Sequence, residues 1–337
     1  MNTSRLKNIK EKEWNNCFTN CKIPNIKTDG RLMALNDKHL IMAWNDEPGS
    51  IKIVNPNKPF KMDPEINIFS FEDSHILDME FSHFDSNIFY FSNENNNIYI
   101  TKITEQNEIL SDFSYCYDSH SSEVYFIDSN PVASNVICSS TLNGEIHIWD
   151  SVRFKKQIDL KVSPNINDIH WNPNGSLIGY STSNKSLTII DPRNSHQILE
   201  DQITEINSKT KFVWLGDYSL ATIGYKIVDK QLYLNLYDIR QTIKKPFSSI
   251  NISSGSSSLT PFVDPELKLI YITAKDDNKI YLYDYDSGNV KKYGDYRTSE
   301  KSNFSIQLNR KYLYKKYQEI DRFARYTKSN KIFYHNI

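Results

Sequence analysis

Glycine is scarce in this chain, at ten of 337 residues, and cysteine is scarcer, at four. The turns of the chain must therefore use asparagine, aspartate and serine, which also tolerate tight backbone conformations. Four cysteines (Cys17, Cys21, Cys116 and Cys138) in so long a chain exclude a disulfide framework. Cys17 and Cys21 have a spacing seen in some zinc sites, but no second Cys or His pair at ligand spacing accompanies them. We expect neither a metal nor another cofactor.

An excess of charge and long apolar runs are also lacking. The net charge of −1 and the pI near 6.7 do not favour a nucleic-acid-binding protein, which would carry an overall positive charge. No stretch approaches the ~20 apolar residues that span a bilayer, so we expect no integral membrane segment. The start, MNTSRLKNIKEKEWNN, lacks the apolar run of a secretory signal, which favours a cytoplasmic protein.

Motifs of the common enzyme classes are missing too. The sequence contains no G-x-S-x-G elbow, no H-E-x-x-H pair, no phosphate loop and no G-x-G-x-x-G. We therefore predict that the protein is not an enzyme.

What the chain does contain is a repeat of strands. Residues 141–150, TLNGEIHIWD, read as a turn followed by an alternating strand that ends in Trp-Asp. Similar strands end near residues 55, 101, 150, 191, 238, 284 and 335, 41 to 51 residues apart. This spacing is typical of propeller blades, each a small antiparallel sheet. No segment longer than about ten residues holds a helical period. The sequence predicts an all-β fold, a seven-bladed β-propeller that occupies residues 1–337 as a single domain.

The last blade has too few strands at its own end. After the strand near 335 the sequence stops, so a fourth, outer strand must come from elsewhere or leave an unpaired edge. The segment Met1–Ile9 is unassigned, and Ser4–Ile9 alternates as an outer strand would. We predict that this N-terminal segment closes the ring.

The blade that ends in Trp149 resembles a Trp-Asp repeat. In such repeats a histidine, a hydroxyl, a polar turn residue and the strand tryptophan form one hydrogen-bonded chain. His120, Ser139, Asn143 and Trp149 occupy the corresponding positions, with Asn143 in place of the usual aspartate. A catalytic His120–Ser139 pair is the alternative, but neither a third orienting group nor an oxyanion turn is evident.

Two longer stretches resemble the coronin family. Residues 168–193, DIHWNPNGSLIGYSTSNKSLTIIDPR, are similar to the coronin blade with W-N-x-x-G-S-L and a closing I-D-P-R. Residues 259–275 match the family in Leu259, Pro261, Phe262, Asp264, Pro265 and Lys275. The opening CFTNCKI and the final EIDRFARY are also similar, so the resemblance runs from about residue 5 to 335. It implies a propeller of the actin cytoskeleton that binds filamentous actin, with cofilin and the Arp complex as functional neighbours. Coronins continue into a coiled coil, whereas no apolar heptad occurs here, so we expect a monomer.

Candidate actin contacts follow from the resemblance and from charge. The resemblance places Lys22 on an arginine linked to filament binding in coronins. Residues 301–337 carry nine Lys or Arg and two Asp or Glu, and the basic positions Arg310, Lys311, Lys315 and Lys316 are candidate contacts. Outward lysines that protect a sheet edge are the alternative for this tail.

Two other functions stay open at this stage. One is a generic Trp-Asp scaffold without actin binding. The other is a phosphoinositide-binding propeller, but such propellers use a Phe-Arg-Arg-Gly motif, and the nearest string here is Arg322-Phe323-Ala324-Arg325.

Overall fold

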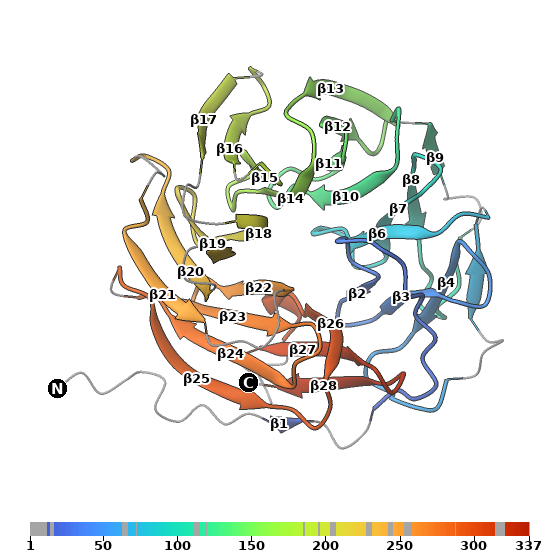
Figure 1. Ribbon diagram of the computed structural model, residues 1–337. Helices are drawn as coiled ribbons and strands as arrows, with labels where there is room; N and C mark the ends of the chain where they lie inside the picture. The colour runs from blue at the N-terminus through green and yellow to red at the C-terminus, as the bar shows by residue number, and fades with distance from the viewer. Residues whose placement is uncertain are drawn as a thin grey trace.

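Seven four-stranded antiparallel sheets are arranged in a ring in the described part of the chain (Figure 1). The structure is a computed structural model. It describes residues 12–13, 17–62, 67–71, 73–110, 115–118, 120–184, 186–194, 196–202, 207–226, 231–241, 245–252, 258–286, 288–313 and 321–336. The predicted all-β, seven-bladed propeller is confirmed.

Each blade is one sheet, numbered from the innermost strand outward. Blade 1 contains β2 (Met33–Leu35), β3 (Leu40–Trp44), β4 (Ser50–Val54) and β5 (Ile68–Ser70). Blade 2 contains β6 (Ile76–Phe81), β7 (Ile88–Asn93), β8 (Asn97–Lys102) and β9 (Tyr115–Asp118). Blade 3 contains β10 (Val124–Ser129), β11 (Val136–Thr141), β12 (Glu145–Asp150) and β13 (Lys155–Lys161). Blade 4 contains β14 (Ile166–Trp171), β15 (Ile178–Thr182), β16 (Ser186–Asp191) and β17 (His196–Gln202). Blade 5 contains β18 (Asn207–Trp214), β19 (Ser219–Lys226), β20 (Gln231–Asp238) and β21 (Ser248–Ile252). Blade 6 contains β22 (Leu259–Asp264), β23 (Leu269–Ala274), β24 (Lys279–Asp284) and β25 (Lys291–Arg297). Blade 7 contains β26 (Ser302–Gln307), β27 (Arg322–Thr327), β28 (Ile332–Asn336) and β1 (Lys12–Glu13), and the 3-10 turn Arg310–Tyr312 precedes β27.

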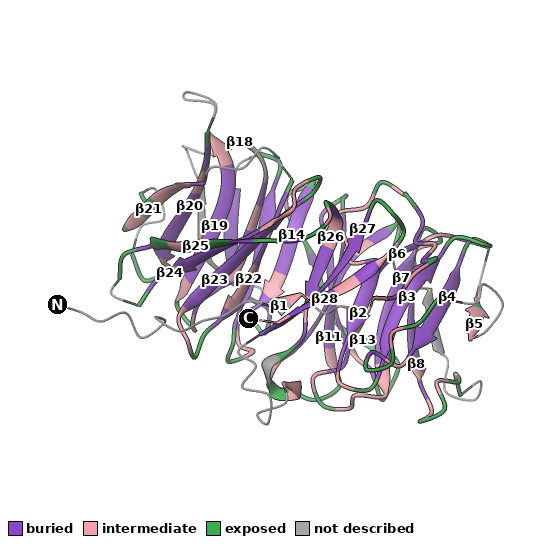
Figure 2. Cartoon of the chain, turned by 90° about the horizontal axis from the view of Figure 1, so that it is seen from below, coloured by how far each residue is buried: buried purple, intermediate pink, exposed green. Residues whose placement is uncertain are grey.

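The third strand of every blade ends where the repeated motif does. These strands end at residues 54, 102, 150, 191, 238, 284 and 336, at or within one residue of the endings marked by the repeat. Alternation fixes the position because one face of each strand is buried against the next blade. Figure 2 shows buried residues along the strands and exposed residues at the turns.

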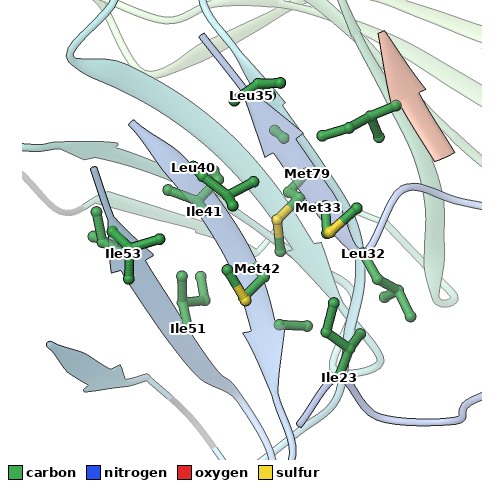
Figure 3. Packing of buried hydrophobic residues seen from close by; sticks show 14 of the residues in the cluster. Ile23, Leu32, Met33, Leu35, Leu40, Ile41, Met42, Ile51, Ile53 and Met79 are labelled. Carbon is green, nitrogen blue, oxygen red and sulfur yellow. The ribbon is translucent and has the colours of Figure 1, made fainter. Parts of the chain in front are cut away.

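Apolar side chains between neighbouring blades form the core. The largest cluster joins blades 7, 1 and 2, and Figure 3 shows Met33 of β2, Met42 of β3 and Met79 of β6 within it. All three methionines are fully buried. Because methionine is unbranched, it fills the wedge-shaped space that remains where blades diverge from the axis.

The N-terminal segment supplies the outer strand of blade 7. Lys12 pairs with Asn336 and Glu13 with His335, so β1 lies beside β28 (Figure 1). Further along, the backbone N–H groups of Phe18 and Ile332 each donate to the other's carbonyl, at 3.0 and 2.9 Å. The segment predicted to close the ring, Met1–Ile9, lies outside the described residues, and the closing strand found is Lys12–Glu13. The ring is thus closed by an N-terminal strand, as predicted, and the described part of that strand is Lys12–Glu13.

The propeller has two faces that carry different loops. We call connector face the end that bears the turns between second and third strands and the links between blades. We call loop face the end that bears the first-to-second and third-to-fourth connections. Because the strands are antiparallel, the two kinds of connection lie at opposite ends of every sheet. Among the described residues there is no helix long and apolar enough to cross a membrane.

Candidate functional site

Lys22 lies on the connector face, in the link from blade 7 to blade 1. Its backbone is fixed on both sides, since Cys21 donates to the carbonyl of Asn330 and Asn45 donates to the carbonyl of Lys22. Its ammonium donates to Asp46 Oδ1 at 2.6 Å, and the Lys22 side chain is 40% exposed. Lys22 is therefore a surface cation held in a defined position.

Asp46 also binds the indole of Trp44, which donates to its second carboxylate oxygen at 2.6 Å. Burial acts to raise the pKa of Asp46, but the hydrogen bonds from Lys22 and Trp44 hold it below its usual value. The carboxylate is therefore charged at neutral pH and offsets part of the Lys22 charge.

The other basic candidates lie on the loop face or outside the described residues. Lys311 belongs to the first-to-second connection of blade 7, and its ammonium donates to the backbone carbonyl of His83 in blade 2. The backbone of Arg310 lies in the same 3-10 turn, whereas Lys315 and Lys316 are not described. The six-residue strand β27 separates this connection from the turn that contacts the Lys22 link, about 20 Å along the sheet. The structure does not bring Lys22 and Lys311 together.

The predicted basic tail is divided in the same way. Of its described cations, Arg322 and Arg325 are buried, with 3% and 1% of their surface exposed. Lys301, Lys328 and Lys331 lie on the connector face, whereas Lys311 lies on the loop face. The described cations of residues 301–337 therefore do not form one surface patch, because alternate turns of one blade point to opposite faces.

His120, Ser139 and Trp149 form a hydrogen-bonded chain across blade 3. The Trp149 indole donates to Ser139 Oγ at 2.8 Å, and Ser139 Oγ lies 2.7 Å from His120 Nε2. The other ring nitrogen, Nδ1, lies 3.2 Å from Glu145 Oε2. With a proton on Nδ1 and the Ser139 hydroxyl donating to Nε2, every polar atom of the chain is satisfied.

Asn143 is not the polar turn residue of this chain. It is exposed in the turn before β12, and Glu145 occupies the position facing His120. Glu145 starts the strand rather than the turn, and its longer side chain reaches back to accept from the Ser121 backbone N–H as well. The network joins β11 and β12 to the segment before β10, and none of its residues lines the central cavity described below.

Two buried histidines should make the fold sensitive to acid. Burial and the charge of His147 lower the pKa of His120 to about 3. Burial and the charge of Arg325 lower the pKa of His335 to about 3 as well. The unfolded chain, with histidine pKa values near 6.5, binds more protons between pH 6.5 and 3, so stability is full above pH 6.5 and lost as the pH falls. We expect each histidine to cost about 2 kcal/mol at pH 5.

Urea unfolding from pH 7.5 to 5 measures this loss, and His335→Phe is the informative variant. Both ring nitrogens of His335 lack a hydrogen-bond partner among the described residues, so the substitution should leave stability at pH 7.5 nearly intact and reduce the acid loss. An unchanged pH dependence would show that His335 is not a source of it.

Two groups of the described residues could be considered for metal binding, and neither fits an ion. His120, Glu145 and His147 offer ligand atoms within 4.8 Å of one another. The two imidazoles are stacked, however, with centroids 3.9 Å apart and planes inclined by 7°, so their in-plane lone pairs cannot converge on one ion. The other candidate is the pair Cys17 and Cys21. Burial raises the pKa of Cys21 to about 12, which disfavours the thiolate that zinc requires.

The innermost strands surround a central cavity of about 1020 Å³. Asp78 and Asp168 line it, and these two and Asp128 each accept a backbone N–H from the first strand of the next blade. Asp78 accepts from Ile127 at 2.8 Å, Asp128 from Trp171 at 2.8 Å, and Asp168 from Phe212 at 3.1 Å. These clamps were not predicted, although in each of them the donor and the acceptor are 43 to 49 residues apart, about one blade.

Cations lie against these carboxylates. His170 lies 3.3 Å from Asp128 and 3.1 Å from Asp168. Burial opposes its charge, but the charge of Asp168 and the contact with Asp128 raise the pKa of His170 to about 10. Arg31 donates to both oxygens of Asp78 at 2.9 Å and lies 3.2 Å from Glu80.

Arg31 enters this network from a segment that crosses the connector-face mouth of the cavity. Gly30 is packed so closely there that a Cβ would lie 2.3 Å from the Leu77 carbonyl and 2.8 Å from that of Tyr125. Only glycine fits without movement of backbone. The link that carries Lys22 is thus fixed at its far end to blades 2 and 3.

Known proteins similar to this chain are coronins. The chain is 25% identical over 279 residues to the coronin-like protein crn1 of Schizosaccharomyces pombe. The aligned region covers 80% of this chain and 46% of that protein. It is 23% identical over 298 residues to the coronin-like protein of Saccharomyces cerevisiae, and the aligned region covers 84% of this chain and 46% of that protein. The chain spans about half the length of the curated relatives it matches. No family model matches it.

The solved structures agree on the fold. The WD40 domain of Toxoplasma gondii coronin matches with a TM-score of 0.87 and 19% identity, over 97% of this chain and 85% of that one. A chain of the mitotic checkpoint complex matches with a TM-score of 0.71 and 15% identity. The structural match shows the propeller fold, and the sequence matches confirm the resemblance to coronins.

Proposed function

We propose that this coronin-like propeller binds actin filaments and catalyses no reaction. The observation that carries the proposal is the similarity to coronins over four fifths of the chain. A place in the cytoplasm and a role in the organisation of the actin cytoskeleton are part of this proposal. The Arp complex and cofilin are the functional neighbours that the family resemblance suggests.

Lys22 supports the proposal as a filament contact. It matches the position of a coronin arginine, and the structure leaves its ammonium at the surface of the connector face. A lysine keeps the charge of arginine but lacks the planar fork that binds a carboxylate through two bonds. Filament binding through this position therefore depends on charge. The filament would have to compete with Asp46 for the Lys22 ammonium.

A phosphoinositide-binding function is disfavoured by burial. Arg322 and Arg325, the nearest approach to a paired-arginine motif, lie inside blade 7. Arg325 donates to the carbonyl of Asp277 at 3.0 Å rather than facing solvent. Neither guanidinium can reach a lipid headgroup without unfolding the blade.

Co-sedimentation with filamentous actin across a salt series tests the proposed function. Binding should weaken steadily as salt rises, because the Debye length falls from ~10 Å at 0.1 M to ~3 Å at 1 M. Flotation with phosphoinositide vesicles is the comparison. Flotation without pelleting on actin would replace the proposal by the lipid-binding one.

Lys22→Asp should reduce filament affinity by about tenfold, since it replaces an exposed attraction by a repulsion. The melting temperature should change by no more than a few degrees, because the lost ion pair with Asp46 is exposed. Lys38→Asp is the matched control, an exposed lysine of blade 1 on the loop face. Equal pelleting of the two variants would remove Lys22 from the site.

A further inference from the structure

Three exposed lysines converge on the connector face between blades 6 and 7. Lys275 lies in the second-to-third turn of blade 6, Lys301 in the link between the blades, and Lys328 in the second-to-third turn of blade 7. The backbone N–H of Lys328 donates to the carbonyl of Lys301. We call Lys275, Lys301 and Lys328 the lysine cluster.

The cluster surrounds a single exposed carboxylate, Asp276. Lys328 forms an ion pair with it at 2.6 Å, and both side chains are about half exposed, at 60% and 49%. The hydrogen bond from Lys328, with the charges of Lys275 and Lys301, lowers the pKa of Asp276. Lys328 pairs with this carboxylate, whereas neither Lys275 nor Lys301 forms an ion pair with a described residue.

Buried groups hold the turns of the cluster in place. Arg325 donates to the backbone carbonyls of Asp277 and Glu300, at 3.0 and 3.4 Å, and so binds the turn after Lys275 to the link before Lys301. The N–H of Asp276 donates to the carbonyl of Ser302 at 2.8 Å. The three lysines therefore project from a rigid base, and a partner binding there orders only the side chains.

The cluster and Lys22 belong to the same face. Lys331 lies in the turn of Lys328 and pairs with Glu300 at 2.8 Å, and Asn330 of that turn accepts from the N–H of Cys21. A path of bonded turns thus leads from the lysine cluster to Lys22.

We propose that the lysine cluster binds an acidic surface of the actin filament and, together with Lys22, forms one contact across blades 6, 7 and 1. This inference rests on the proposed function and adds its location. Lys275 and Lys301, exposed on turns held by buried groups and without an ion pair to a described residue, favour an anionic partner, because such a partner supplies the opposite charge that they lack.

Two variants with equal change in net charge test the proposal. The first is the triple variant Lys275→Ala, Lys301→Ala, Lys328→Ala. The control is Lys38→Ala, Lys58→Ala, Lys155→Ala, three exposed lysines elsewhere on the propeller. Each is measured by co-sedimentation with actin filaments from 50 to 300 mM salt, and thermal melting establishes that both are folded.

The cluster variant should bind about tenfold more weakly at low salt and respond less to salt than the original chain. The control should stay within about twofold, since it loses only non-specific attraction. Equal losses in both variants, or none in the cluster variant, would overturn the cluster as the contact while leaving filament binding itself in place. Failure of the unmodified chain to pellet would instead overturn the proposed function, and this inference with it.

Discussion

Replacing Arg31 with alanine should lower the free energy of unfolding by about 3 kcal/mol, the low end for breaking a buried ion pair. The substitution leaves Asp78, whose side chain is 1% exposed, and Glu80, at 14%, without their cation. Burying an uncompensated carboxylate is costly because the interior replaces little of its hydration. The low end applies because the Arg31 side chain itself is 35% exposed.

Urea unfolding measures this change, and Arg153→Ala is the matched control. Arg153 also faces an aspartate, Asp150, but at 3.7 Å and with 78% of its side chain exposed. An exposed pair of this kind contributes about 0.5 kcal/mol or less. A similar loss in both variants would show that the Arg31 network does not hold blades 2 and 3 together.

The difference between these two arginines explains part of what sequence reasoning could predict. Strand endings follow from alternation, a local property, and the sevenfold count follows from its repetition. The partners of Arg31 lie 47 and 49 residues away, in another blade. One signal was available, since Asp78, Asp128 and Asp168 each lie in a first strand at nearly one blade's spacing. This spacing indicates clamps between blades only if the strand that carries each aspartate is known to be the innermost one, and the strand pattern of the sequence does not show that.

The candidate site shows the same limit. Lys22 was predicted through a family resemblance, whereas Lys275, Lys301 and Lys328 come from three separate turns and adjoin only after two blades pack. Lys311 is close to Lys301 in sequence but belongs to the other face, because strand β26 lies between them. Charge counted along the chain therefore groups cations that lie on opposite faces, and counting turns within each blade would have separated the two faces.

The last prediction concerns ring closure, and it contrasts two truncations. Deleting residues 1–9 keeps β1, whereas deleting residues 1–19 also removes the Lys12–Glu13 pairing with β28 and the fully buried Phe18. Loss of a buried phenylalanine side chain alone costs about 3–5 kcal/mol. The longer deletion also exposes the backbone edge of β28. It should lower the melting temperature by roughly 5–10 °C.

The shorter deletion should melt within about 2 °C of the full chain, because the described closing contacts begin at Lys12. Phe18→Ala in the full chain separates packing from strand pairing, since it keeps β1 and removes the contact between Phe18 and Tyr334, whose ring centroids lie 6.1 Å apart. Limited proteolysis within residues 332–336 reports the exposed edge. If deletion of residues 1–9 already costs as much as the longer one, the closing strand begins before Lys12, as the alternation of Ser4–Ile9 first indicated. If neither deletion matters, the inner strands alone keep the ring closed, through the contact of β26 with β2.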